Sequence, residues 1–210
     1  SEIPTFLEET VADLKQFGQV KFITRDIEGC FTNMPKEAIK FGLRERLKDI
    51  TRTHGYTSIT VPYKDSERCE FNSKKRVRIW KIPFETLLDI MEFALDNTYI
   101  ADLKGDIWKQ NKGIPMGDPH SPGMCIGACG WMEHEWMQSL SQQSKRFFRA
   151  TRYMDDILLG YAECGQFNAQ AFLEDFDTSE CYWQPMRLEE GSKTTFLETT
   201  FYISENNECR

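Results

Sequence analysis

Two adjacent aspartates, Asp155 and Asp156, interrupt an apolar run in RYMDDILLG, residues 152–160. An ionised carboxylate loses several kcal/mol of hydration in apolar surroundings unless a cation or hydrogen bonds compensate it, and two neighbouring carboxylates also repel. A third aspartate, Asp26, lies near the end of the apolar segment VKFITRDI, residues 20–27. Carboxylate oxygens suit Mg²⁺ or Mn²⁺, hard ions that also bind substrate phosphates. The three aspartates therefore predict a site for two such ions, able to promote an in-line displacement at phosphorus.

The Asp155–Asp156 pair also has a simpler interpretation. Asp is common in turns because its side chain bonds to the nearby backbone. From the residues alone, a metal site and an ordinary hairpin turn both stay open.

The three aspartates can converge only if the segments that carry them are neighbours in one sheet. Residues 147–162 are predicted as two short strands joined at the aspartate pair, and 20–27 alternates as a strand does. Small residues on one face of a helix expected at 124–140 would let another backbone approach closely. Strands mixed with helices favour an α+β fold, a sheet with helices on one face, in one domain over 1–210. Other helices are expected at 35–54, 83–97 and 165–176, strands at 57–63, 76–82, 181–188 and 195–203, and a hairpin at 98–110.

Composition bounds the class of protein. The 210 residues are 40% hydrophobic, enough for one packed domain, and contain neither an apolar window of membrane-spanning length nor a signal-peptide pattern. Seven scattered cysteines without a C-x-x-C pair favour an intracellular, reducing compartment. The net charge of −7 argues against a nucleic-acid partner, but three basic clusters, at 74–78, 104–112 and 145–152, oppose that argument.

Four motifs in order resemble reverse transcriptases. RYMDDILLG is similar to their Y-x-D-D motif, and DIEGCFTNMP (26–35) resembles the first catalytic motif, particularly in Penelope-like retroelements. The hairpin and G-x-x-M-G segment at 99–123 and FLETTFYIS at 196–204 resemble two further motifs of these elements. The resemblance implies a polymerase palm-like antiparallel sheet backed by helices, with partial fingers elements. It also implies an RNA-directed DNA polymerase that adds dNTPs to a DNA primer on an RNA template, with no membrane partner.

The resemblance assigns roles to individual residues. Asp26, Asp155 and Asp156 match the catalytic metal-binding triad for two Mg²⁺ or Mn²⁺ ions, with the backbone carbonyl of Ile27 as a further ligand. Phe31 matches the aromatic position that excludes a ribonucleotide 2′-hydroxyl, which argues for DNA synthesis. The other matches are to nucleotide-binding positions (Met116, Gly117 and Lys193) and to primer or template positions (Tyr153, Met154, Ser121 and Pro122). Lys193 has an equal alternative as a surface turn residue.

The resemblance does not extend to every part of a complete reverse transcriptase. Full fingers, a thumb and an endonuclease are not evident, so we expect a palm-centred fragment. A non-catalytic palm-like domain that binds RNA or protein is the alternative function. RNA-directed RNA synthesis is disfavoured, because such enzymes usually place a polar or acidic group where Phe31 stands.

Overall fold

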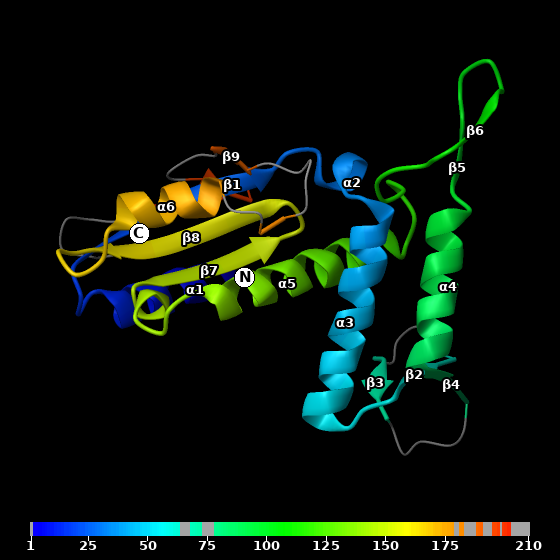
Figure 1. Cartoon of the computed structure of the whole chain (residues 1–210), viewed down its shortest axis with the longest axis horizontal. Helices are drawn as coiled ribbons and strands as arrows, with labels where there is room; N and C mark the ends of the chain where they lie inside the picture. The colour runs from blue at the N-terminus through cyan, green and yellow to red at the C-terminus, as the bar shows by residue number, and fades with distance from the viewer. Residues whose placement is uncertain are drawn as a thin grey trace. The chain divides into compact units, whose positions relative to one another are not determined.

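The computed structural model describes residues 2–63, 68–72, 78–178, 181–182, 188–190, 195–197 and 199–202. The chain forms two compact units. Figure 1 labels helices and strands of both. The discontinuous unit contains Ser1–Asn33 and Met132–Arg210, and the inserted unit contains Met34–Trp131. The expectation of one domain over the whole chain stays a prediction.

The discontinuous unit is built on an antiparallel sheet with the strand order β7-β8-β1-β9. The long central pair joins β1 to β8 over eight residue pairs, and β7 joins β8 as a hairpin. The strands predicted at 20–27 and 147–162 are confirmed, and so is the α+β class. Their bounds are Gln19–Ile27 for β1, Phe148–Tyr153 for β7, Asp156–Glu163 for β8 and Leu188–Glu190 for β9.

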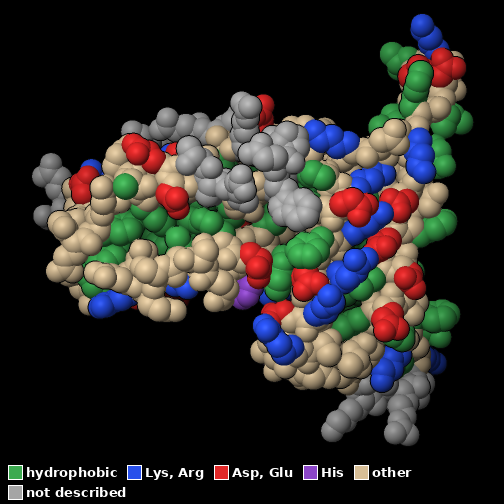
Figure 2. Space-filling view, in the orientation of Figure 1, with side chains coloured by type: hydrophobic (Ala, Val, Ile, Leu, Met, Phe, Trp, Pro, Cys, Tyr) green, Lys and Arg blue, Asp and Glu red, His purple; other side chains and the backbone are tan. Residues whose placement is uncertain are grey.

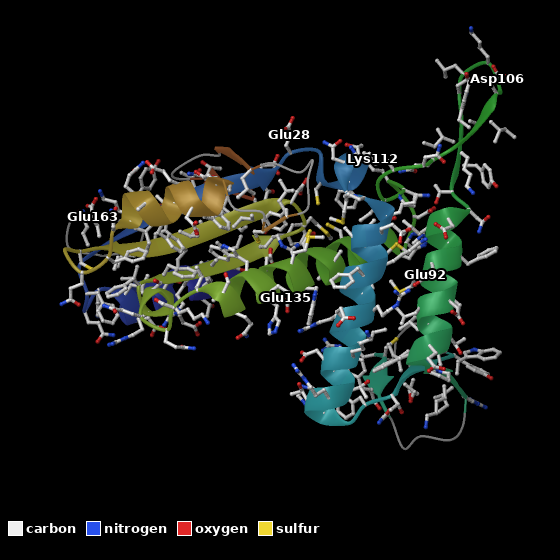
Figure 3. All side chains as sticks on the ribbon, viewed as in Figure 1. Glu28, Glu92, Asp106, Lys112, Glu135 and Glu163 are labelled. Carbon is white, nitrogen blue, oxygen red and sulfur yellow. The ribbon has the colours of Figure 1, made fainter. Side chains whose placement is uncertain are left out.

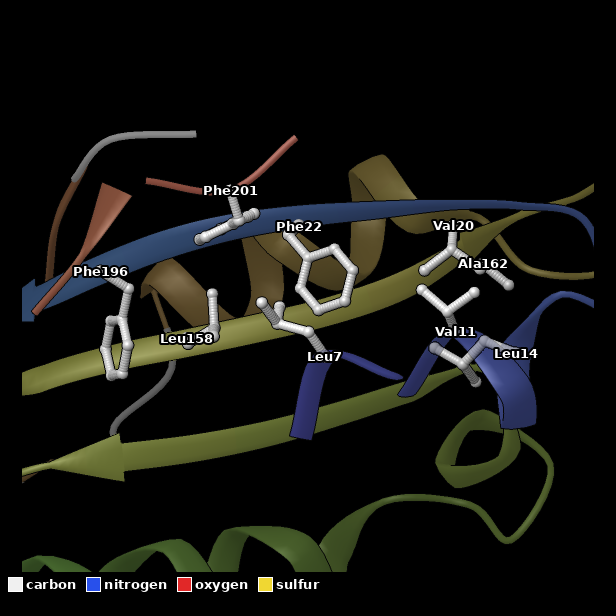
Figure 4. Packing of buried hydrophobic residues seen from close by; sticks show 9 residues of the cluster. All are labelled: Leu7, Val11, Leu14, Val20, Phe22, Leu158, Ala162, Phe196 and Phe201. Carbon is white, nitrogen blue, oxygen red and sulfur yellow. The ribbon is translucent and has the colours of Figure 1, made fainter. Parts of the chain in front are cut away.

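One face of this sheet is covered by α1, Glu2–Leu14, a helix that the sequence analysis missed. Leu7, Val11 and Leu14 recur at helical spacing and are buried. They pack with residues of β1 and β8 in the cluster shown in Figure 4, which also includes Val20, Phe22, Leu158, Ala162, Phe196 and Phe201.

The opposite face is covered as well, so the expectation of helices on one face only is wrong. Phe172 of α6, Ala169–Thr178, packs against Phe148 of β7 with the ring centroids 4.6 Å apart, and Phe172 and Phe176 both contact Trp136. The physical reason lies in β8, where every residue from Ile157 to Ala162 is buried. A strand that is apolar at successive positions needs cover on both faces.

The C-terminal strands differ from those predicted. Cys181 and Tyr182 form no strand, 183–187 lie outside the described residues, and β9 begins only at Leu188. Within 195–203, two short strands pair with each other, β10 at Thr195–Phe196 and β11 at Thr199–Thr200. They are too short for alternation to reveal a turn between them.

The inserted unit confirms the predicted helices at 35–54 and 83–97, the predicted strand at 57–63 and the hairpin at 98–110. The strand predicted at 76–82 is confirmed from Ile79 onward, while 76–77 lie outside the described residues. Prolines precede both helices, and Gly55 ends the first in a left-handed conformation at φ 69°. Asp106 lies at the hairpin tip (Figure 3). The bounds are α3 Lys36–His54, β2 Ser58–Pro62, β3 Glu70–Phe71, β4 Ile79–Pro83, α4 Phe84–Asp96, β5 Tyr99–Ala101 and β6 Ile107–Lys109.

Close helix packing in the inserted unit depends on glycine. A Cβ at Gly42 of α3 would lie 2.9 Å from the Cα of Ala128, and one at Gly127 would lie 2.5 Å from Leu43 Cδ2. Ala128 and Gly127 belong to α5, Ser121–Ser139, the helix predicted at 124–140. The expected close approach at its small residues is therefore confirmed.

The surface of the inserted unit combines ion pairs with exposed apolar side chains. Charged residues of both signs cover the face of α3 and α4 in Figure 2, and two pairs there join the helices, Lys40 to Asp96 and Arg44 to Glu92. Phe93 of α4 is 71% exposed and Ile107 of β6 is 73% exposed. None of the helices in the described part of the chain has the length and apolar content needed to cross a membrane.

Candidate metal centre

The register of the central strands brings two of the three aspartates together. Asp26 of β1 is paired directly with Asp156 of β8. Directly opposed residues of an antiparallel pair point to the same face, with Cβ atoms about 4.5–5.5 Å apart. Tyr153 is paired with Asp156 from the other side, so it shares this face. The convergence expected from the sequence is therefore observed for Asp26 and Asp156.

The third aspartate lies in the hairpin turn between β7 and β8. The turn consists of Met154 and Asp155, and the backbone carbonyl of Asp155 accepts a hydrogen bond from the Ile27 N–H at 3.1 Å. The end of β1 is thereby fastened to the turn. Met154 has φ 56°, a left-handed conformation that is strained for a bulky residue.

The local electrostatics disfavour the ionised form of Asp156. Burial, followed by the charge of Asp155, raises the pKa of Asp156 above its ordinary value. Within the described residues, no lysine or arginine forms an ion pair with Asp155 or Asp156.

The donor types fit Mg²⁺ or Mn²⁺, because three aspartates lie at the same end of the β1–β8 pair. Among the described residues, however, these carboxylates do not form a cluster whose ligand oxygens all lie within 4.8 Å of one another. The structure thus shows suitable ligand types at one location, but not a set of ligand oxygens already arranged around an ion.

Phe31 lies shortly after the end of β1, on the short helix α2, Cys30–Asn33, and is half-buried. The preceding Gly29 has φ 56°, and a Cβ there would meet Asn33 Nδ2 at 2.6 Å. The amide of Asn33 is in turn bonded to the carbonyl of Glu28, a residue labelled in Figure 3. The backbone conformation of this turn and its close contact with Asn33 therefore both favour glycine at position 29.

Three residues that the sequence analysis did not place at the site support the turn. The Arg152 Nη1 donates to the Met154 carbonyl at 2.7 Å, while its Nε and Nη2 contact the two carboxylate oxygens of Glu133. The Tyr182 hydroxyl donates to Glu133 Oε1 at 2.7 Å. The sequence analysis places Arg152 only within a basic cluster. In the structure, Arg152 pairs with the buried Ile157 in the β7–β8 register, so its side chain lies on the same face as Ile157.

The structure shows where the other predicted nucleotide- and primer-binding residues lie, and their roles stay predictions. Tyr153 is exposed, Met116 is 71% exposed, and Ser121 is buried at the first position of α5, followed by Pro122. Gly117 has φ 95° with nothing within 4 Å of an added Cβ, so in this structure its glycine is required by conformation rather than by crowding. Lys193 lies outside the described residues.

Comparisons with known proteins identify the fold. No family model and no curated protein matches the sequence. Apo telomerase from Candida tropicalis superposes with a TM-score of 0.68 at 13% identity, over 100% of this chain and 36% of that one. Telomerase from Candida albicans, in complex with a TWJ fragment of telomeric RNA, superposes with a TM-score of 0.64 at 14% identity. That match covers 100% of this chain and 34% of the telomerase chain. The chain therefore has a reverse-transcriptase-like fold and spans about a third of the length of these telomerases.

Proposed function

We propose that this chain is the palm-centred part of an RNA-directed DNA polymerase, which adds dNTPs to a primer 3′-hydroxyl on an RNA template. The observation that carries the proposal is the pairing of Asp26 with Asp156 beside Asp155 in a strained turn. The strain at Met154 and the raised pKa of Asp156 both reduce stability, and such features are retained where they serve a site. The reverse-transcriptase-like fold supports the same assignment.

In this proposal, Asp26, Asp155 and Asp156 hold two Mg²⁺ or Mn²⁺ ions, with the Ile27 carbonyl as a further ligand. Such ions activate the attacking hydroxyl and neutralise the leaving pyrophosphate. Tyr153 is exposed on the face that carries Asp156, so it is available to the primer terminus. Phe31 excludes a 2′-hydroxyl by steric clash.

The partners and origin are also part of the proposal. The Candida albicans telomerase is in complex with an RNA fragment, which supports an RNA partner for this chain. The order of the four motifs supports a Penelope-like or allied retroelement as the source, with an intracellular location.

Primer extension on an RNA template tests the reaction. Wild type is expected to extend with dNTPs and Mn²⁺, and Asp155→Asn is expected to lose at least a thousandfold in rate because a metal ligand is gone. Asp175→Asn removes an exposed carboxylate of α6 in the same unit and should retain wild-type activity. Equally efficient use of rNTPs by wild type would contradict the role given to Phe31.

Calorimetric titration of Mn²⁺ separates the proposal from its alternative. Wild type should bind Mn²⁺ and Asp155→Asn should bind it at least tenfold more weakly. Identical weak binding by both would favour a non-catalytic palm-like domain that binds RNA or protein.

A further inference from the structure

A continuous set of contacts leads from the back of the sheet to the turn that carries Asp155. Arg152 and Ile157 are partners in the β7–β8 register, so both point to the face opposite Asp156. On that face, Arg152 contacts Glu133 of α5 through two nitrogens and the Met154 carbonyl through a third. Glu133 is held in its turn by the Tyr182 hydroxyl.

This set of contacts acts where the backbone is strained. A non-glycine residue in the left-handed region is destabilised by about 1–3 kcal/mol and persists only where its surroundings hold it. The Met154 carbonyl is the group that follows the strained φ and precedes Asp155. An arginine bond to that carbonyl therefore restrains the peptide that orients the aspartate.

The burial of the ion pair makes it a rigid support. The Arg152 side chain is 8% exposed and that of Glu133 is 30% exposed. A planar guanidinium bound to both oxygens of a carboxylate is held in one geometry, unlike a surface pair that samples many. Burial, then the Glu133 charge, raises the pKa of the neighbouring Cys181 thiol to about 12, with Arg152 opposing this shift. The thiol therefore stays neutral beside the pair.

We propose that Glu133, Arg152 and Tyr182 are positioning residues, which hold the turn of Met154 and Asp155 in the geometry that the metal ions need. Arg152 acts directly on the turn, Glu133 fixes Arg152, and Tyr182 fixes Glu133. The part that concerns metal binding rests on the proposed function. The part that concerns the turn does not, because it can be measured in metal-free protein.

The Ile27 amide reports on the turn, because its bond to the Asp155 carbonyl breaks when the turn opens. In the full chain with EDTA, Glu133→Gln is expected to accelerate hydrogen exchange of the Ile27 amide at least tenfold relative to that of Ile23 in the same strand. Tyr182→Phe, which removes one hydroxyl and is expected to fold normally, should accelerate it by a smaller factor. Arg152→Lys keeps the positive charge but loses the planar group that contacts both oxygens of Glu133. It should therefore accelerate Ile27 exchange as much as Glu133→Gln does.

Mn²⁺ affinity supplies the second readout. Loss of a residue that orients a metal ligand typically weakens metal binding about 10- to 100-fold, which we expect for Glu133→Gln. Asp177→Asn is the matched control, since Asp177 binds Arg25 through both carboxylate oxygens on the same face of the sheet. The side chains of Arg25 and Asp177 are 9% and 34% exposed, and the carboxylate of Asp177 on α6 bonds to Arg25 rather than to the turn. The control should lose stability while Ile27 exchange relative to that of Ile23, and Mn²⁺ affinity, stay at wild-type values.

The outcomes separate the two proposals. Wild-type exchange at Ile27 in Glu133→Gln and Arg152→Lys would overturn the positioning role. So would equal acceleration in Asp177→Asn, since that would indicate only general destabilisation. Identical Mn²⁺ binding by wild type and Asp155→Asn would overturn the metal site, while a selective effect on Ile27 would still support the positioning of the turn.

Discussion

At the scale of single residues, Asp156 keeps a charge where the fold disfavours it. Its carboxylate is partly buried, faces Asp26 across the strand pair and follows Asp155 in sequence. Burial and the charge of Asp155 both disfavour the ionised form, and within the described residues no ion pair with lysine or arginine offsets them. Function-related residues commonly reduce stability in this way.

Asp156→Asn is therefore expected to stabilise the metal-free protein at pH 7, by about 0.5–2 kcal/mol. Because the folded-state pKa of Asp156 is raised, the folded protein takes up a proton more readily than the unfolded chain. The lower stability of wild type relative to Asp156→Asn should be absent below the unfolded-state pKa of Asp, about 3.9. It should appear as the pH rises through the pKa of Asp156 in the folded protein. Urea unfolding of both proteins in EDTA, at pH 7 and below pH 4, measures it; an equal difference at both pH values would contradict the expectation.

The sequence was informative about the aspartates because a charge in an apolar strand is a local anomaly. It did not reveal Arg152, Glu133 and Tyr182 as one cluster, because they come from three separate elements and each is an ordinary residue locally. Gly29 was not singled out either. Its positive φ and its contact with Asn33 belong to the folded turn and leave no periodic signal.

At the scale of elements, long periodic segments were predictable and short ones were not. The bounds of α3 and α4 follow from apolar periodicity together with Pro35, Gly55 and Pro83. The helix α1 was missed although its apolar spacing was present. The strands β9, β10 and β11 are two or three residues long, and their pairing depends on tertiary contacts rather than on local pattern.

Gly42→Ala tests the close packing of α3 against α5. The added methyl would lie 2.9 Å from backbone at Ala128, which cannot rotate away as a side chain can. Overpacking of this kind destabilises by about 1–3 kcal/mol, more than the gain in helix propensity. Gly123→Ala is the control, because in α5 its Cβ would meet nothing within 4 Å. Chemical denaturation should show a loss for the first variant alone; equal stability would exclude the tight contact.

At the scale of the whole molecule, charge and exposed apolar surface act together. The chain carries a net charge of −7 and has an isoelectric point of about 5.1. Ile107 and Trp108 of the β5–β6 hairpin are exposed, and a two-stranded sheet leaves open edges that favour association. Charge repulsion is what opposes association at neutral pH.

Turbidity against pH is accordingly expected to peak near pH 5, where the net charge vanishes. Ile107→Thr should lower that peak at least twofold, because it removes an exposed apolar side chain while retaining strand propensity. Tyr202→Thr changes an exposed aromatic of the other unit and should leave the peak nearly unchanged. A peak unaffected by Ile107→Thr would exclude the hairpin as the contact.

The pairing of Asp26 with Asp156 also sets an order of events during synthesis. These partners are 130 residues apart in the chain. At about 5–20 residues per second, β1 leaves the ribosome roughly 7–26 s before β8 can join it. During that interval Val20, Phe22 and Ile23 have no partner strand, while the inserted unit, a single continuous segment, can already fold. The nascent chain is therefore expected to need a chaperone at its N-terminal strand until the aspartate hairpin emerges.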